Sequence, residues 1–168
     1  MAIIVGIAGP SRAGKTFLAR LISEHSTSLH VKTLHQDEFV KPIHQIPLIN
    51  GHVDWESPES VDFPRYRHAI IEAAGQPGIV IAEGLLSFYD PGILQLFDRK
   101  IFISLSCDEF THRKRTDLRW GKEPEWYIHH IWKSYLRFGQ CPADESNTMR
   151  IDGESDFIIE KVMKFIFS

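Results

Sequence analysis

Eight residues near the start of the chain have the types and the spacing needed to hold a polyphosphate. They run Gly9-Pro10-Ser11-Arg12-Ala13-Gly14-Lys15-Thr16, which is a G-x-x-x-x-G-K-T pattern. The two glycines let a loop curl so that several backbone N–H groups converge on one anion, and a helix N-terminus after the loop attracts negative charge. The spacing therefore predicts a phosphate-binding P-loop at 9–16.

The members of this loop have different tasks. Lys15 would place a cation on the β- and γ-phosphates of ATP, and the hydroxyl of Thr16 is a suitable ligand for Mg²⁺. The backbone cradle is expected from Gly9, Ser11, Ala13 and Gly14. The sequence thus predicts ATP and Mg²⁺ as cofactors.

A glycine-rich turn between a strand and a helix is common, so an accidental match is the competing interpretation. The flanking residues argue against it, because an apolar run at 2–8 precedes the loop and apolar residues at helical spacing follow it at 17–22. Further strand-like runs lie at 29–34, 78–82, 100–105 and, weakly, 148–151. Helical stretches separate them, which predicts an α/β P-loop NTPase fold, a doubly wound parallel sheet with helices on both faces.

Several of the expected helices have recognisable ends. Ser106 and Glu109 have the spacing of a capping box, and Pro58 suits the first turn of another helix. The expected helices span 58–75, 106–118, 125–138 and 157–166. Residues 41–57 contain two prolines and little periodicity, so we expect a flap there, and a short helical lid at about 112–124.

Length and composition limit the class of protein. The chain has 168 residues, 43% of them hydrophobic, which suits one buried core and predicts a single domain over 1–168. The net charge of −3 gives no reason to expect nucleic acid or a membrane surface as partner. Cys107 and Cys141 have no partner at metal or redox spacing. We expect a soluble cytoplasmic protein that is a monomer or a small homo-oligomer.

Acidic residues follow two of the strand-like runs, where ligands bind in open α/β sheets. Asp37 lies beyond the run at 29–34, and Glu83 lies beyond the run at 78–82. Phosphoryl transfer to a hydroxyl needs a carboxylate near the acceptor and oxygen ligands for Mg²⁺. A turn cap or a solvated strand end is the ordinary role of an isolated acid. Beside a P-loop we expect Asp37 at the acceptor, and Asp37, Thr16 and Glu83 around Mg²⁺, whereas Glu38 is expected to be solvated.

A basic segment at 112–119 follows the run that ends at 105. Such a segment is most often a solvated helix face. In kinases, however, arginines of a closing lid meet the charge of the transferring phosphoryl group and exclude water. We expect Arg113 and Arg119 to contact ATP and Arg115 to act in catalysis. Lys114 and Lys122 are expected to be solvated.

Five blocks resemble the nicotinamide riboside kinases, within the wider uridine kinase-like group of P-loop nucleoside kinases. They are Gly9 to Thr16, then Gln36-Asp37-Glu38-Phe39 with Lys41-Pro42, then Trp55-Glu56-Ser57-Pro58-Glu59-Ser60-Val61-Asp62-Phe63, then Ile81-Ala82-Glu83-Gly84-Leu85-Leu86, and Arg113-Lys114-Arg115. The blocks occur in the family's order and cover most of the chain. The second and third are much narrower signatures than the P-loop.

The resemblance implies ATP-dependent phosphorylation of the 5′-hydroxyl of nicotinamide riboside, which gives nicotinamide mononucleotide for NAD salvage. By matching position it implies that Asp37 is the acceptor-side carboxylate, Glu83 a Mg²⁺-shell acid and Glu56 the acid that binds the ribose diol. Further substrate contacts are expected from Lys41, from Trp55 stacking on the base, and from Trp120 on its second face. Core packing is the alternative role of each tryptophan.

Two departures from the family pattern are visible. The family usually has Asp where this chain has Glu56, and the added methylene shifts the carboxylate by about one C–C bond length. Ribose selection is then loosened, or Asp54 takes over the role. The spacing between Arg115 and Trp120 also requires a small shift to align.

Other functions stay open from the residues alone. A uridine or cytidine kinase, or a kinase for another small metabolite such as a pantothenate-like acid, would share the phosphate-binding residues. A nucleotide-dependent switch is a different class, and the absence of an N-K-x-D motif lowers the GTPase version of it. A switch would hydrolyse nucleotide slowly and regardless of added nucleosides.

Overall fold

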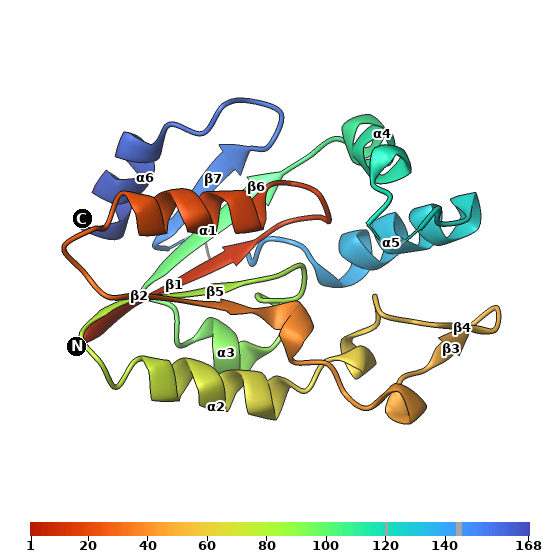
Figure 1. Cartoon of the computed structure of the whole chain (residues 1–168), viewed down its shortest axis with the longest axis horizontal. Helices are drawn as coiled ribbons and strands as arrows, with labels where there is room; N and C mark the ends of the chain where they lie inside the picture. The colour runs from red at the N-terminus through yellow and green to blue at the C-terminus, as the bar shows by residue number, and fades with distance from the viewer. Residues whose placement is uncertain (120, 144–145) are drawn as a thin grey trace.

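The computed structural model of the chain describes residues 1–119, 121–143 and 146–168 (Figure 1). A five-stranded sheet forms its centre. The strands are β1 (Ala2–Ala8), β2 (Val31–His35), β5 (Gly78–Glu83), β6 (Arg99–Ser104) and β7 (Thr148–Asp152). Their order is β2-β5-β1-β6-β7, and every neighbouring pair is parallel. The parallel α/β sheet expected from the alternation of runs is confirmed.

Both faces of this sheet are buried, as β5 illustrates. Ile79 and Ile81 belong to one hydrophobic cluster, whereas Val80 and Ala82 belong to the other. Successive residues of a strand point to opposite faces, so a continuous apolar run is what a strand covered on both sides requires. Helices α1 (Lys15–Glu24) and α6 (Ile159–Ile166) cover one face, and α2 (Phe63–Ala73) with the short α3 (Pro91–Leu94) covers the other (Figure 1).

Two further helices, α4 (Cys107–Thr116) and α5 (Glu125–Phe138), lie beyond the carboxyl ends of the strands (Figure 1). The bounds of α5 agree with the expected range 125–138. The hydroxyl of Ser106 accepts the Glu109 N–H at 3.2 Å, which confirms the cap of α4. In a capping box the Glu109 side chain would accept the Ser106 N–H. Here that N–H donates to Glu154 Oε1 at 2.8 Å instead. Among the described residues no helix combines the length and apolar character needed to span a bilayer.

The predicted helix at 58–75 is wrong at its start. Pro58–Ser60 form a separate 3₁₀ turn, and α2 begins at Phe63. Asp62 provides the cap, because its Oδ1 accepts the Arg65 N–H at 3.0 Å. An acidic cap followed by a proline in the first turn is a stronger helix start than a proline alone.

The flap at 41–57 contains more structure than the expected loop. A 3₁₀ turn at Ile43–Gln45 precedes a small antiparallel hairpin of β3 (Leu48–Ile49) and β4 (His52–Val53). Asn50 and Gly51 form its turn with φ of 49° and 78°. The Tyr127 hydroxyl donates to the carbonyl of Val53 at 3.4 Å, so the hairpin is connected to α5.

Candidate functional site

The P-loop joins the central strand β1 to α1, which is the placement that the motif requires. Gly9 has a φ of +152°, and a Cβ there would lie 2.3 Å from the carbonyl oxygen of Ile103. Gly14 has a φ of +100° and immediately precedes the first residue of the helix. Both positions therefore need glycine, and the backbone N–H groups at the start of α1 face the edge of the sheet where the strands end.

Lys15 is the point on which the predicted acids converge. Its Nζ donates to the carbonyl of Pro10 at 2.8 Å, so the ammonium group lies over the loop. Burial lowers the pKa of Lys15, while the charges of Glu83, Glu56 and Asp37 act in the opposite direction. The three carboxylates that the sequence analysis assigned to one site thus all act on the same ammonium group.

Glu83 ends β5 and is almost completely buried, at 5% exposure. Its Oε1 accepts a hydrogen bond from Thr16 Oγ1 at 2.8 Å and lies 2.7 Å from Nδ1 of His35. The register of β2 and β5 places His35 directly opposite Glu83. A threonine hydroxyl beside a carboxylate supplies the hard oxygen ligands that Mg²⁺ prefers, so these two residues fit a magnesium site.

Asp37 lies in a short 3₁₀ turn, Gln36–Glu38, that follows β2. This turn is attached to the loop after β5, because Gln36 Oε1 accepts the Leu86 N–H at 2.7 Å. Asp37 itself is exposed, and its negative charge opposes the lowering of the Lys15 pKa by burial. The carboxylate is therefore accessible to an acceptor hydroxyl beside the P-loop.

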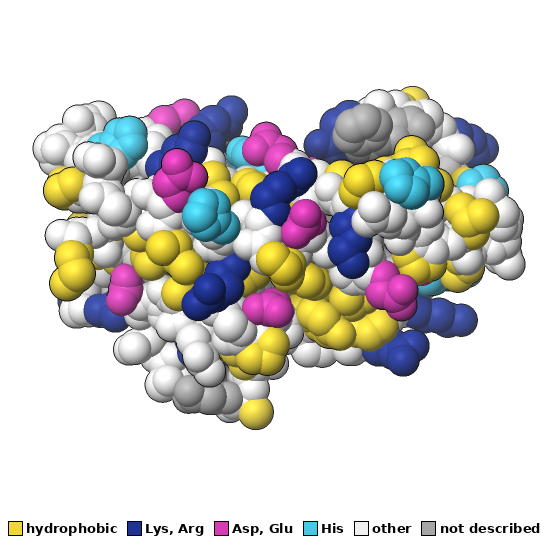
Figure 2. Space-filling model, turned by 90° about the horizontal axis from the view of Figure 1, so that it is seen from below, with side chains coloured by type: hydrophobic (Ala, Val, Ile, Leu, Met, Phe, Trp, Pro, Cys, Tyr) yellow, Lys and Arg dark blue, Asp and Glu magenta, His cyan; other side chains and the backbone are white. Residues whose placement is uncertain are grey.

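Lys41 lies on the outer side of the flap. Together with Pro42, Phe63 and Tyr89 it lines an open groove of about 420 Å³ between the flap and the start of α2. Figure 2 shows the molecule from this side, with exposed hydrophobic side chains among acidic and basic ones. The P-loop is not part of the groove lining, so a contact of Lys41 with substrate remains a prediction.

The flap carries three candidate substrate residues in a row. Trp55 is 42% exposed, as a stacking surface must be. Asp54 Oδ1 accepts the Glu56 N–H at 3.2 Å and lies 2.7 Å from Nε2 of His130 on α5. Asp54 therefore holds the flap to α5, whereas Glu56 contributes only its backbone N–H to this contact.

Glu56 lies in the flap, near a set of charged side chains. Burial raises the pKa of Glu56 to about 7, and the neighbouring charges of Glu123 and Asp54 act in the same direction. The charges of Lys114 and His130 oppose this shift. Glu56 is consequently a carboxyl group that changes its protonation state near neutral pH.

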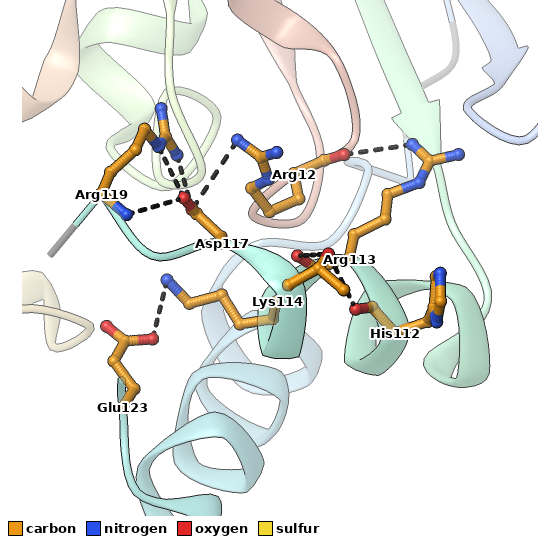
Figure 3. A network of polar contacts seen from close by, with 8 residues as sticks. Arg12, His112, Arg113, Lys114, Asp117, Arg119 and Glu123 are labelled. Carbon is orange, nitrogen blue, oxygen red and sulfur yellow. Dashed lines mark hydrogen bonds and ion pairs between the residues drawn. The ribbon is translucent and has the colours of Figure 1, made fainter. Parts of the chain in front are cut away.

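The expectation that Lys114 is solvated is wrong. Lys114 is 8% exposed, and its Nζ lies 2.9 Å from Glu123 Oε2 (Figure 3). The side chain extends from α4 toward the segment that precedes α5, where Glu123 supplies the opposite charge. Lys122, in contrast, is exposed as expected.

Each of the three predicted lid arginines has partners within the protein. Arg113 donates to Glu109 Oε1 at 2.6 Å, to the Arg12 carbonyl at 3.1 Å and to the Gly153 carbonyl at 3.0 Å. Arg115 binds Glu125 with two guanidinium nitrogens at the exposed end of α4. Arg119 binds Asp117 in the same bidentate way. Trp120, the predicted second stacking residue, lies outside the described residues.

Comparison with known proteins shows which sequences the chain is similar to. No protein-family model matches the chain. Human nicotinamide riboside kinase 1 is 27% identical over 158 residues, which is 84% of this chain and 78% of that protein. Uridine kinase from Chloroflexus aurantiacus is 26% identical over 142 residues, 69% of this chain and 68% of that protein. The chain is thus similar in sequence to nicotinamide riboside kinases and to uridine kinases, at 26 to 27% identity.

Solved structures agree with this relationship at the level of the fold. A gluconokinase from Sinorhizobium meliloti has a TM-score of 0.62 and 16% identity, with 98% of this chain and 89% of that chain covered. Shikimate kinase from Aquifex aeolicus has a TM-score of 0.56 and 16% identity, with 98% and 96% covered. These structures show that the fold is shared. The sequence relatives support an ATP-dependent kinase.

Sequence reasoning missed two residues that contact predicted members of the candidate site, His35 and Asp117. His35 had a usable signal, because it ends the strand that pairs with the strand ending in Glu83. Asp117 had no such signal in the sequence, because its contacts depend on where α4 ends relative to the P-loop.

Among the described residues, no group of three or more His, Cys, Asp or Glu side chains has the arrangement of a metal site.

Proposed function

We propose that this kinase transfers the γ-phosphoryl group of ATP to the 5′-hydroxyl of nicotinamide riboside, which gives nicotinamide mononucleotide. The observation that carries the proposal is the convergence of Asp37, Glu56 and Glu83 on Lys15, with exposed Trp55 next to Glu56. The sequence relatives named nicotinamide riboside kinase support the choice of substrate. We also propose that the reaction takes place in the cytoplasm and serves NAD synthesis.

ATP would bind with its phosphates over the P-loop. The backbone N–H groups at the start of α1 and the ammonium group of Lys15 would hold the β- and γ-phosphates. Thr16 and Glu83 would hold Mg²⁺, which when bound neutralises charge on the phosphate oxygens. His35 would keep the Glu83 carboxylate in orientation through its Nδ1 contact of 2.7 Å.

Asp37 would orient the acceptor hydroxyl and take its proton. The hydroxyl oxygen forms a bond to the γ-phosphorus while the bond between that phosphorus and the β–γ bridging oxygen breaks, and ADP leaves. Arg119 is close enough to Asp37 for the two charges to interact. We therefore assign Arg119 to the transferring group. Arg113 uses all three guanidinium nitrogens for contacts within the protein, and Arg115 is paired with Glu125 at the exposed end of α4.

The flap would select the nucleoside. The carboxylate of Glu56 would accept hydrogen bonds from the ribose diol, and the ring of Trp55 would stack on the base. Because the nicotinamide ring is cationic, an aromatic face adds cation–π attraction of about 0.5–2 kcal/mol, which is about 2- to 30-fold in affinity. Neutral uracil gains stacking alone.

The first test is a substrate screen. Purified protein with ATP and Mg²⁺ is given nicotinamide riboside, nicotinic acid riboside, uridine, cytidine or pantothenate, and the product is identified by mass. We expect nicotinamide mononucleotide to form fastest. The alternative supported by a specific finding is a uridine or cytidine kinase, since a uridine kinase is among the relatives. Uridine monophosphate as the main product would replace our proposal by that alternative.

The second test removes the acceptor-side carboxylate. Asp37→Asn should lower nucleoside-dependent ADP release by about 10²- to 10⁴-fold, the usual contribution of a general base. Binding of ATP should be kept. Glu38→Gln is the matched control, because Glu38 is an exposed acid of the same 3₁₀ turn. Equal activities of the Asp37→Asn variant and the wild-type protein would rule out the role of Asp37.

A further inference from the structure

Asp117 is a buried carboxylate at the C-terminal end of α4, within the expected lid at 112–124. Its side chain is 3% exposed. Oδ1 accepts hydrogen bonds from the backbone N and the Nε of Arg119 at 3.3 and 2.9 Å, and Oδ2 accepts one from Nη2 at 2.8 Å (Figure 3). These hydrogen bonds hold the pKa of Asp117 at about 2, so the group is charged throughout the physiological range.

The same carboxylate reaches the P-loop. Nη1 of Arg12 lies 3.7 Å from Oδ2 of Asp117. Arg12 has a left-handed backbone with a φ of 66°, and its carbonyl accepts a hydrogen bond from Arg113 at 3.1 Å. The end of α4 thus holds Arg12 by its side chain and by its main chain, as Figure 3 shows.

Asp117 leaves one edge of the Arg119 guanidinium available. Nε and Nη2 are used by Asp117, whereas the side chain as a whole is 63% exposed. The hydrogen bonds with Asp117, and then the charges of Asp117 and Asp37, raise the pKa of Arg119. The charge of Asp37 thus acts on Arg119 as well as on Lys15. An unpaired arginine loses side-chain conformational entropy when it binds phosphate. The hydrogen bonds with Asp117 already restrict the side chain of Arg119, so its further loss on binding is smaller.

We propose that Asp117 is a positioning residue that presents Arg119 to the terminal phosphate of the nucleotide and connects the lid to the P-loop through Arg12. This inference rests on the proposed function only in taking ATP as the phosphate donor. It needs no particular acceptor, because the group that Arg119 meets is the phosphate itself. Asp117 acts through Arg119 and does not touch the substrate.

The test compares a non-hydrolysable ATP analogue, adenylyl imidodiphosphate, with ADP by titration calorimetry. Asp117→Asn should weaken binding of the analogue about fivefold and leave the affinity for ADP within twofold, because only the analogue has a γ-phosphate for Arg119. Asp117→Asn and Arg119→Ala together should bind the analogue no more weakly than Arg119→Ala alone. Glu24→Gln is the control, because it removes the carboxylate of another arginine pair, Arg20 with Glu24, far from the site.

A second variant leaves the buried acid in place, in case Asp117→Asn does not fold. Arg119→Lys keeps the positive charge but cannot be held by two parallel hydrogen bonds. We expect it to lose as much affinity for the analogue as Arg119→Ala. The proposal would be overturned if Arg119→Lys bound the analogue as tightly as the wild-type protein. It would also be overturned if the double variant bound the analogue more weakly than Arg119→Ala alone, by the factor that Asp117→Asn causes by itself. Failure of every tested nucleoside as acceptor would refute the proposed function while leaving these binding results interpretable.

Discussion

Glu56 is expected to destabilise the folded protein at neutral and alkaline pH. Its pKa rises from 4.5 to about 7, mainly through burial. One pKa unit corresponds to 1.36 kcal/mol, so a shift of about 2.5 units makes the ionised group cost the folded state about 3 kcal/mol. Glu56→Gln removes the charge and keeps the shape, and should therefore stabilise the protein by about that amount at pH 8.

The pH dependence follows from the sign of the shift. Below pH 4.5 the carboxyl group is protonated in both the folded and the unfolded chain, and it contributes nothing. Between 4.5 and 7 the folded chain binds more protons than the unfolded chain, so the free energy of unfolding decreases as the pH rises. Above 7 the loss is complete. The Glu56→Gln variant lacks this component, and the two stability curves should separate through this window.

Urea unfolding at several pH values between 4.5 and 8 measures both curves. Glu59→Gln is the matched control, since Glu59 is an exposed acid of the same segment. Its curve should follow that of the wild-type protein. If the wild-type and Glu56→Gln curves stay parallel over the whole range, the carboxylate is not held in a low-dielectric site and our reasoning about Glu56 is wrong.

The same variant should lose activity while gaining stability. A neutral amide still reaches the ribose diol but without charge-assisted hydrogen bonds, which are about twice as strong as neutral ones. The wild-type kcat/KM should rise with an apparent pKa near the value of about 7 assigned to Glu56, and the Glu56→Gln profile should lack this step.

Two further predictions concern the metal and the base. Glu83→Gln should raise the Mg²⁺ concentration needed for half-maximal activity about 10- to 100-fold, measured by ADP release at saturating ATP, because Thr16 and His35 both lose a charged partner; an unchanged Mg²⁺ requirement would exclude Glu83 from the metal site. Trp55→Ala should raise the KM for nicotinamide riboside about 2- to 30-fold more than the KM for uridine, whereas Trp55→Phe should keep part of this difference; equal increases for both nucleosides would show that the cation–π contribution is absent.

Features set by local sequence were predictable here. The strands were visible as apolar runs because both faces of a parallel sheet are buried, and α5 kept its expected bounds because its amphipathic pattern is long and uninterrupted. The predicted start of α2 was wrong because the sequence contains two helix-start signals, one at Pro58 and one at Asp62. Only the second combines an acidic cap with a proline in the first turn. The hairpin turn at Asn50 and Gly51 had a known signal, an Asn-Gly pair, that was not used.

Features that depend on register and packing were not predictable from one sequence. Lys114 lies in a basic run whose sequence is typical of an exposed helix face. Its burial is stabilised by the ion pair with Glu123, which the local sequence does not reveal. His35 gains its role from the strand opposite, and Asp117 gains its role from the P-loop. Each requires a partner distant in sequence, which no local pattern contains.

The last turn of α4 connects the two halves of the site. Arg113 donates to the P-loop carbonyl of Arg12, while Lys114, the next residue, pairs with Glu123 and its charge acts on Glu56 in the flap. Asp117 then returns toward the P-loop and carries Arg119. Because one short segment contacts the P-loop and also acts on Glu56, a movement of the flap that displaces Glu56 is expected to act on the residues that hold the P-loop. Closure over the nucleoside and alignment of the phosphates are therefore expected to be coupled through α4.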